Sequence, residues 1–256
     1  MGLDPLYYIL SIPALILSAI FSARVKSVFS KYAKVRAESG MSGAEAAATM
    51  LAKAGVSNVE IKTTSGFLSD HYNPLDKTLN LSPDVYNGRS LASLGVACHE
   101  AGHALQHASG YRWLGLRSAL VPVANLGSRF AYIVFFAGLM LSAGAAGQGG
   151  TAAAGTAAGG AAAGGGLGMM LVKAGIVLFC GAVAFSLVTL PVEWNASARA
   201  KRELVKHGLL SPTEEKGAAA VLNTAFMTYV AAAVSSISTL FYFLIRSGLL
   251  NGGRRR

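Results

Sequence analysis

The sequence predicts an α-helical integral membrane protein with about four transmembrane helices and a small α+β domain. Composition is the first reason: 53% of the 256 residues are hydrophobic and 13% are charged, which is too apolar for a soluble domain. The second reason is that the apolar residues gather in four stretches of a length that can cross a bilayer. Third, the Lys and Arg residues cluster beside these stretches, where membrane proteins carry their orientation signals.

Seven segments follow one another along the chain. We expect a first transmembrane helix over 1–22, a polar domain over 23–118, a second transmembrane helix over 119–147, an Ala/Gly linker over 148–166, a third transmembrane helix over 167–190, a polar segment over 191–223, and a fourth transmembrane helix with a basic tail over 224–256. The first stretch lacks a basic start, so it predicts a retained anchor rather than a signal peptide. Pro191 is expected to end the third span and to open a polar helix. The Ala/Gly run has no large side chains that could form a core, which favours a flexible linker.

Inside the polar domain, the pattern predicts a small sheet that leads into one long helix. The expected elements are a helix over 42–54, a strand over 56–64, a hairpin of two short strands over 69–82, and a helix over 90–109. Ser42 and Glu45 have the spacing of a capping box, which marks the start of the first of these helices.

The last of these helices carries the sequence His99-Glu100-Ala101-Gly102-His103. Residues four apart lie above one another on a helix, so His99 and His103 can direct their imidazoles to one metal ion. Glu100 lies on the neighbouring flank, where a carboxylate can take a proton from an attacking water. This arrangement is typical of zinc hydrolases. The alternative is a chance polar stripe on a helix of a basic, Ala-rich protein.

A catalytic zinc site needs a third protein ligand. His107 continues the spacing of four residues, but it is rotated further round the helix, and the longer metzincin pattern is absent. His207 is expected at a helix C-terminus, where a cation is favourable without any ligand role. Glu193 is the better candidate, because two membrane crossings separate it from His103 and bring both segments out on the same side. Alternatively, Glu193 only complements the dipole of the helix that Pro191 opens.

Several segments resemble the YugP-like neutral zinc metallopeptidases of bacterial membranes. They are Ser42-Gly-Ala-Glu45, Ser69-Asp-His-Tyr-Asn-Pro74, Leu79-Asn-Leu-Ser82, the eleven residues 96–106 around the histidine pair, and the nine residues 192–200. The resemblance implies a gluzincin-like peptidase domain in which His99, His103 and Glu193 bind one Zn²⁺ ion and Glu100 is the general base. A more distant likeness is to HtpX-like membrane gluzincins.

In those HtpX-like proteins, an Asp four residues after the ligand Glu supports a zinc-bound histidine. Here that position holds Ser197, a weaker hydrogen-bond acceptor, and Asn195 or Asp70 is the alternative support. Asp70, His71 and Tyr72 are candidates for lining a substrate cleft beside the sheet edge, because such an edge can bind many peptide sequences through main-chain hydrogen bonds. The same three residues also suit an ordinary polar turn and strand surface. Candidates for stabilising an oxyanion are His71, Tyr72 and Tyr86, which the sequence does not rank.

The sequence therefore predicts a zinc metalloendopeptidase that acts on peptides or proteins, membrane proteins included. One rival is a site-2 type protease, of whose motif Asn73-Pro74-Leu75-Asp76 is a fragment; however, it precedes the histidine pair and lies in a polar hairpin. A second rival is a zinc-stabilised membrane scaffold or adaptor without peptidase activity. Nucleic-acid binding, which the net charge of +10 would allow, is disfavoured by the spans.

The expected location is the cell membrane, with the site on the cytoplasmic side. Sixteen of the 22 Lys and Arg residues lie in 23–118 and 191–224, and cytoplasmic segments carry such an excess. The basic tail at 254–256 conflicts with four crossings, unless the last span is re-entrant or the tail is an exception. The oligomeric state does not follow from the sequence.

Overall fold

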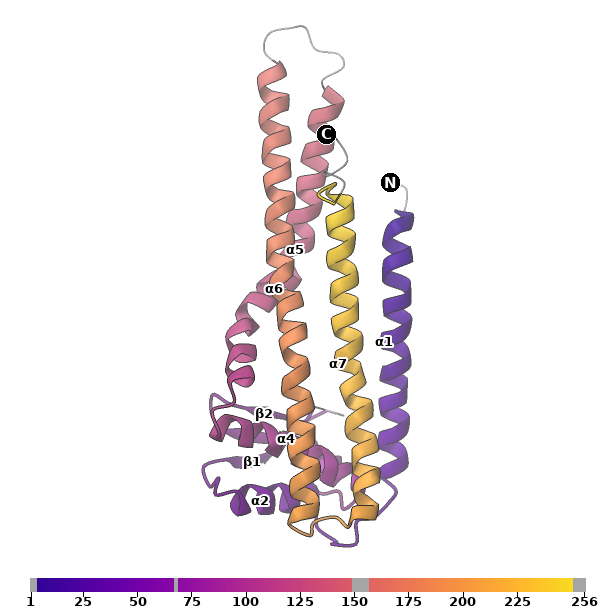
Figure 1. Cartoon of the computed structure of the whole chain (residues 1–256), viewed down its shortest axis with the longest axis vertical. Coiled ribbons are helices and arrows are strands. Elements are labelled where there is room, and N and C mark those ends of the chain that lie inside the picture. The colour runs from indigo at the N-terminus through magenta and orange to yellow at the C-terminus, as the bar shows by residue number, and fades with distance from the viewer. Residues whose placement is uncertain (1–3, 67–68, 149–156, 251–256) are drawn as a thin grey trace. The chain divides into compact units, whose positions relative to one another are not determined.

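Four long apolar helices dominate the protein, which we describe from a computed structural model that covers residues 4–66, 69–148 and 157–250 (Figure 1). These helices are α1 (Pro5–Tyr32), α5 (Arg112–Gln148), α6 (Ala157–Lys206) and α7 (Pro212–Arg246). Each contains a stretch long and apolar enough to cross a membrane. The prediction of a mostly helical protein with four apolar spans and a small sheet is confirmed.

The three-stranded sheet has the order β1-β3-β2. Its strands are β1 (Glu60–Thr63), β2 (His71–Asn73) and β3 (Thr78–Leu81). Strands β2 and β3 pair antiparallel, whereas β1 pairs parallel to β3. In the turn between β2 and β3, the Asn73 side chain accepts a hydrogen bond from the Leu75 N–H, a local bond that closes the predicted hairpin. Because β3 lies between the other two strands, β2 forms an edge of the sheet.

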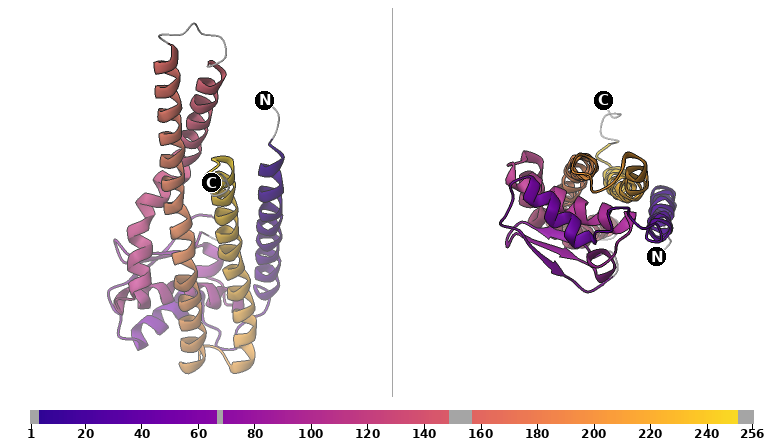
Figure 2. Two further views of the ribbon diagram at one scale, coloured as in Figure 1. Left: turned by 45° about the horizontal axis from the view of Figure 1, so that its top comes forward. Right: turned by 90° about the horizontal axis from the view of Figure 1, so that it is seen from below.

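Three shorter helices complete the polar part: α2 (Gly43–Lys53), α3 (Pro83–Tyr86) and α4 (Leu91–Ala108). The predicted capping box is present at the start of α2, where Ser42 accepts from the Glu45 N–H and Glu45 accepts from the Ser42 N–H. Helix α4 contacts α2 and the sheet, and its glycines bring it close to α6 and α7 (Figure 2). It is therefore the central element of the hydrophobic core that these elements share.

The chain divides into two compact units. The first comprises Met1–Leu15, Ala119–Leu187 and Ala232–Arg256, and the second comprises Ile16–Ser118 and Val188–Ala231. Most of the described residues of the first unit belong to segments of the four long helices, which pack through an aromatic cluster around Phe135 and Phe243. The second unit contains the sheet, the short helices and every predicted metal ligand.

Helix α6 differs from the expectation in two ways. Pro191 lies inside this helix instead of ending one, so the third apolar stretch and the polar segment after it form a single element. Proline is tolerated inside long membrane helices, because neighbouring helices and small local adjustments satisfy the backbone groups that it disturbs. In addition, α6 begins at Ala157, so residues 157–166 of the predicted linker are helical. Residues 149–156 of that linker and residues 251–256 of the basic tail lie outside the described residues.

Candidate metal centre

Helix α4 presents His99 and His103 on one face, as the spacing of four residues predicts. The helix begins at Ser90, whose side chain accepts a hydrogen bond from the Ser93 N–H. Gly102 faces α6, where a Cβ atom in its place would lie 2.7 Å from the carbonyl oxygen of Ala196. Because no side chain separates the two backbones at this point, α6 approaches closely enough to bring Glu193, one turn before Ala196, to the histidine pair.

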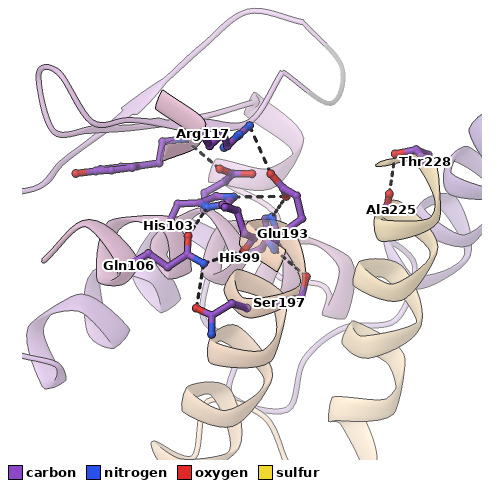
Figure 3. Close-up of polar contacts among 12 residues, drawn as sticks. His99, His103, Gln106, Arg117, Glu193, Ser197, Ala225 and Thr228 are labelled. Atoms are coloured by element: carbon purple, nitrogen blue, oxygen red, sulfur yellow. Dashed lines mark hydrogen bonds and ion pairs between the residues drawn. The ribbon is translucent and has the colours of Figure 1, made fainter. Parts of the chain in front are cut away.

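The side chains of His99, His103 and Glu193 converge (Figure 3). The Nε2 atoms of His99 and His103 lie 3.1 Å and 3.5 Å from the same oxygen, Oε2 of Glu193. Tetrahedral zinc with ligand bonds of about 2.0–2.1 Å requires ligand atoms about 3.3 Å apart. The observed distances match this value, so the three side chains fit a single ion. In the part of the chain that the structure describes, no other three His, Cys, Asp or Glu side chains converge in this way.

Gln106 orients His103. Its side-chain nitrogen donates to the carbonyl oxygen of Val192 at 2.8 Å and to Oδ1 of Asn195 at 3.0 Å. The amide oxygen therefore faces Nδ1 of His103, 3.0 Å away, and accepts its proton. This bond leaves the Nε2 lone pair of His103 for a metal. Gln106 is fully buried, so water does not compete for these bonds.

Ser197 holds the other histidine, because its Oγ lies 3.1 Å from Nδ1 of His99. Both histidines thus have a neutral hydrogen-bond partner from the chain. The second carboxylate oxygen of Glu193, Oε1, lies 3.5 Å from Nη2 of Arg117 at the start of α5. Burial lowers the pKa of His103, but the adjacent Glu193 carboxylate more than compensates, so that the pKa of His103 is raised above its ordinary value.

Glu100 lies between the metal ligands and the edge strand. Its Oε2 accepts a hydrogen bond of 3.0 Å from the backbone N–H of Tyr72 in β2. This N–H points away from β3, which means that the free edge of β2 faces the Glu100 side of the site. A peptide that paired with this edge would pass beside the carboxylate of Glu100.

A pocket of about 390 Å³ opens at the site. His99, Glu100 and Glu193 line it together with residues from α1 and α7. The α7 residues are Leu222, Ala225, Phe226, Thr228 and Tyr229, which follow the spacing of one helix face. The Thr228 hydroxyl donates to the Ala225 carbonyl, so the phenol of Tyr229 is the α7 group that can donate into the pocket. It interacts electrostatically with both Glu193 and Glu100.

The other sequence-predicted residues surround this centre in different ways. Asp70 lines the pocket, but its carboxylate accepts from the N–H and hydroxyl of Ser82 rather than from a histidine. Burial, together with the nearby Glu100 carboxylate, raises the pKa of Asp70 despite these bonds. The His71 ring is exposed and lies 2.9 Å from the Ser69 carbonyl oxygen. Only the backbone of Tyr72 reaches the site, because its hydroxyl bonds to Nδ1 of His107.

Asn195 contacts Gln106 rather than a metal ligand. Its Oδ1 accepts from Gln106 and from Nε of Arg199, so it fixes the residue that orients His103. Tyr86 packs against the hydrophobic core of the second unit and does not line the pocket. His207 follows Lys206, the last residue of α6, as expected for a position at a helix C-terminus, and it pairs with Glu203 at 3.0 Å.

Sequence reasoning missed Gln106, Arg117 and Tyr229. Gln106 had a detectable signal: it lies three residues after His103, so it is a polar side chain near the same face of an otherwise apolar helix. Arg117 and Tyr229 had no local signal. Each lies on a long apolar helix, and their place at the site depends on how those helices pack against α4 and α6.

Residues 7–248 match the protein family described as "Putative neutral zinc metallopeptidase". The chain belongs to this family. A relative from Bacillus subtilis (strain 168), named "Putative membrane protease YugP", is 40% identical over 240 residues, which cover 94% of this chain and 96% of the relative. No solved structure matches the chain. The resemblance to the YugP-like family is confirmed, and the four apolar helices agree with a membrane protein.

Proposed function

We propose that this protein is a membrane-embedded zinc metallopeptidase that hydrolyses peptide bonds. The observation that carries the proposal is the convergence of His99, His103 and Glu193 at distances that fit one zinc ion, with Glu100 in the same pocket. Three protein ligands leave a fourth position open, as catalytic zinc sites do and structural sites do not. Membership of the family and the name of the Bacillus subtilis relative support the same chemistry.

Bound to these residues, zinc would lower the pKa of a coordinated water toward about 7 and polarise the scissile carbonyl. Glu100 takes the proton of the attacking water and passes it to the leaving amine. The Tyr72 N–H holds Oε2 of Glu100, which leaves Oε1 for this proton transfer. Tyr229 donates a hydrogen bond to the carbonyl oxygen, where negative charge develops as water attacks.

The substrate is an extended peptide that adds to the edge of β2. Main-chain bonds to the outward groups of this edge, among them the carbonyl oxygen of Tyr72, place the peptide beside Glu100 without requiring a particular sequence, while the Tyr72 N–H stays with Glu100. The pocket formed with α1 and α7 then receives one substrate side chain, and its lining by Val25, Leu222 and Phe226 favours an apolar one.

Replacement of the general base tests this function. Purified full-length protein should cleave casein or a peptide in a manner that chelators abolish, and the Glu100→Gln variant should keep its zinc while losing cleavage. Glu60→Gln is the matched control, because Glu60 is exposed on β1, does not line the pocket and forms an ion pair with Lys62. A Glu100→Gln protein that still cleaves would refute the mechanism. Chelator-sensitive zinc binding without any cleavage by the unaltered protein would instead favour the scaffold function.

The site is proposed to face the cytoplasm, because most of the Lys and Arg residues lie on its side of the spans. Helix α7 is continuous over Pro212–Arg246 and long enough for a full crossing. Single cysteines at positions 150 and 210 test the orientation: a membrane-impermeant thiol reagent should label position 150 from outside. Labelling at 210 and not at 150 would reverse the assignment.

A further inference from the structure

Three charged residues mark one level in the first unit. Asp4 and Arg246 form an ion pair of 3.2 Å, and the Tyr242 hydroxyl also donates to Asp4. Lys173 belongs to the same level. Gly175, two residues after it, packs directly on Phe135, and the Phe135 ring stacks at 4.0 Å on Phe243, which lies three residues before Arg246. Uncharged stretches of α1, α6 and α7 start from these residues. We take this level as one boundary of the hydrocarbon layer.

Counting along the helices locates the other boundary. Uncharged stretches of 19 residues separate Asp4 from Arg24 in α1 and Lys173 from Glu193 in α6. At a rise of 1.5 Å per residue, each spans about 28 Å, close to the roughly 30 Å of a bilayer core. The uncharged stretch of α7, residues 217–245, is longer than the layer. One crossing takes about 20 residues, so the part of α7 that spans the layer runs from Arg246 back to Phe226.

The contacts of the second unit agree with these counts. The rings of Trp194, next to Glu193, and Phe226 lie 5.3 Å apart, so α6 and α7 reach the boundary at the same place. Lys26 of α1 lines the pocket together with Phe226. Trp194 is 57% exposed and lies under the ammonium group of Lys201, an arrangement typical of the membrane interface. Arg129 of α5, the one charged residue described between the two levels, is exposed and long enough to extend toward headgroups.

We propose that the metal centre lies in the headgroup layer and that its substrates are membrane-anchored polypeptides, cut within a few residues of the bilayer surface. This inference rests on the proposed peptidase function for its substrate class, but the depth of the site does not depend on it. Glu193 is the first residue of α6 beyond the hydrocarbon, and α1 and α7 carry the pocket wall into the lipid boundary. A juxtamembrane segment reaches such a site without leaving the surface, whereas a soluble protein must unfold against it.

Depth-dependent quenching tests the position of the site without any activity. Trp113→Phe leaves Trp194 as the only tryptophan, since the chain has two. In vesicles of lipids brominated at different chain positions, bromines near the headgroup end should quench Trp194 most strongly. Quenching that is strongest for bromines at the chain end would overturn the placement. So would Trp194 fluorescence that is the same in brominated and unbrominated lipid. Trp113→Tyr replaces the first variant if that protein does not fold.

Anchored substrates test the substrate class. One cleavable peptide is joined directly to a transmembrane helix, and in a second substrate a rigid helical spacer of about 20 residues holds the same peptide roughly 30 Å from the membrane. The full-length protein in lipid should cleave the first substrate at least tenfold faster, with Glu100→Gln as the blank. Equal rates would overturn the substrate class and leave the peptidase function intact. Absence of cleavage of both substrates would contradict the peptidase function, while the quenching result would still decide the depth.

Discussion

Gly102→Ala tests whether close packing of α4 on α6 assembles the metal centre. The added Cβ would lie 2.7 Å from the Ala196 carbonyl oxygen, whereas ordinary contacts begin near 3.4 Å, so the helices must separate by several tenths of an ångström. Overpacking of this kind costs about 1–3 kcal/mol. If the metal-bound state bears that cost, zinc affinity falls by about 5- to 150-fold, because 1.4 kcal/mol corresponds to tenfold. Glu193 would move away from both histidines, whose own helix is unchanged.

Competition with a fluorescent chelator measures this affinity, and thermal unfolding of the zinc-free protein reports the packing cost separately. Gly115→Ala is the matched control, since Gly115 is helical and exposed and a Cβ there meets nothing within 4 Å. Its zinc affinity should equal that of the unaltered protein, and its stability should be equal or slightly higher because Ala favours a helix. A Gly102→Ala protein with unchanged zinc affinity and unchanged unfolding would refute the proposed role of this contact.

Three further predictions concern the surroundings of the metal. Gln106→Leu preserves size but leaves the Nδ1–H of His103 without its acceptor, so zinc affinity in the same chelator assay should fall about 10- to 100-fold; an unchanged value would remove Gln106 from the account. Tyr229→Phe should lower kcat about 100- to 1000-fold with zinc content and KM preserved, whereas Tyr86→Phe should match the unaltered enzyme; equal loss in both variants would indicate a structural effect. The zinc-free protein should lose stability as pH rises through the folded pKa of His103, because a raised pKa stabilises the fold fully only below the unfolded value of about 6.5. Melting curves between pH 5 and pH 9 check this direction, which His103→Gln should abolish.

Local periodicity was sufficient to predict the helix that carries the histidines. The expected helix over 90–109 corresponds to α4, with Ser90 and Ser109 as its caps, because capping and a 3.6-residue repeat are local properties of the chain. The capping box at Ser42 and the hairpin around Asn73 were predictable for the same reason. Glu193 required one more argument, the return of the chain through two spans, and the structure brings it to the histidines.

The remaining parts of the site depend on packing between distant segments. Tyr229 lies 126 residues after His103 in an apolar stretch, and nothing near it in the sequence marks it as part of a polar site. The rule that proline ends one helix or opens the next comes from soluble helices. It fails at Pro191, because α6 continues through this residue. The sequence offers Ser197 as a residue that could support a histidine, but its contact with His99 rather than His103 depends on the rotation of α6.

The zinc K-edge absorption spectrum of the metal-loaded protein tests the central claim most directly, because it reports the ligands themselves. With His99, His103 and Glu193 as ligands, we predict nitrogen and oxygen scatterers at about 2.0–2.2 Å, the outer-shell pattern of two imidazoles, and no sulfur. Replacement of His103 should remove one imidazole from that pattern. A sulfur scatterer at about 2.3 Å, which Cys98 or Cys180 would supply, or a spectrum without imidazole, would contradict the proposed metal centre.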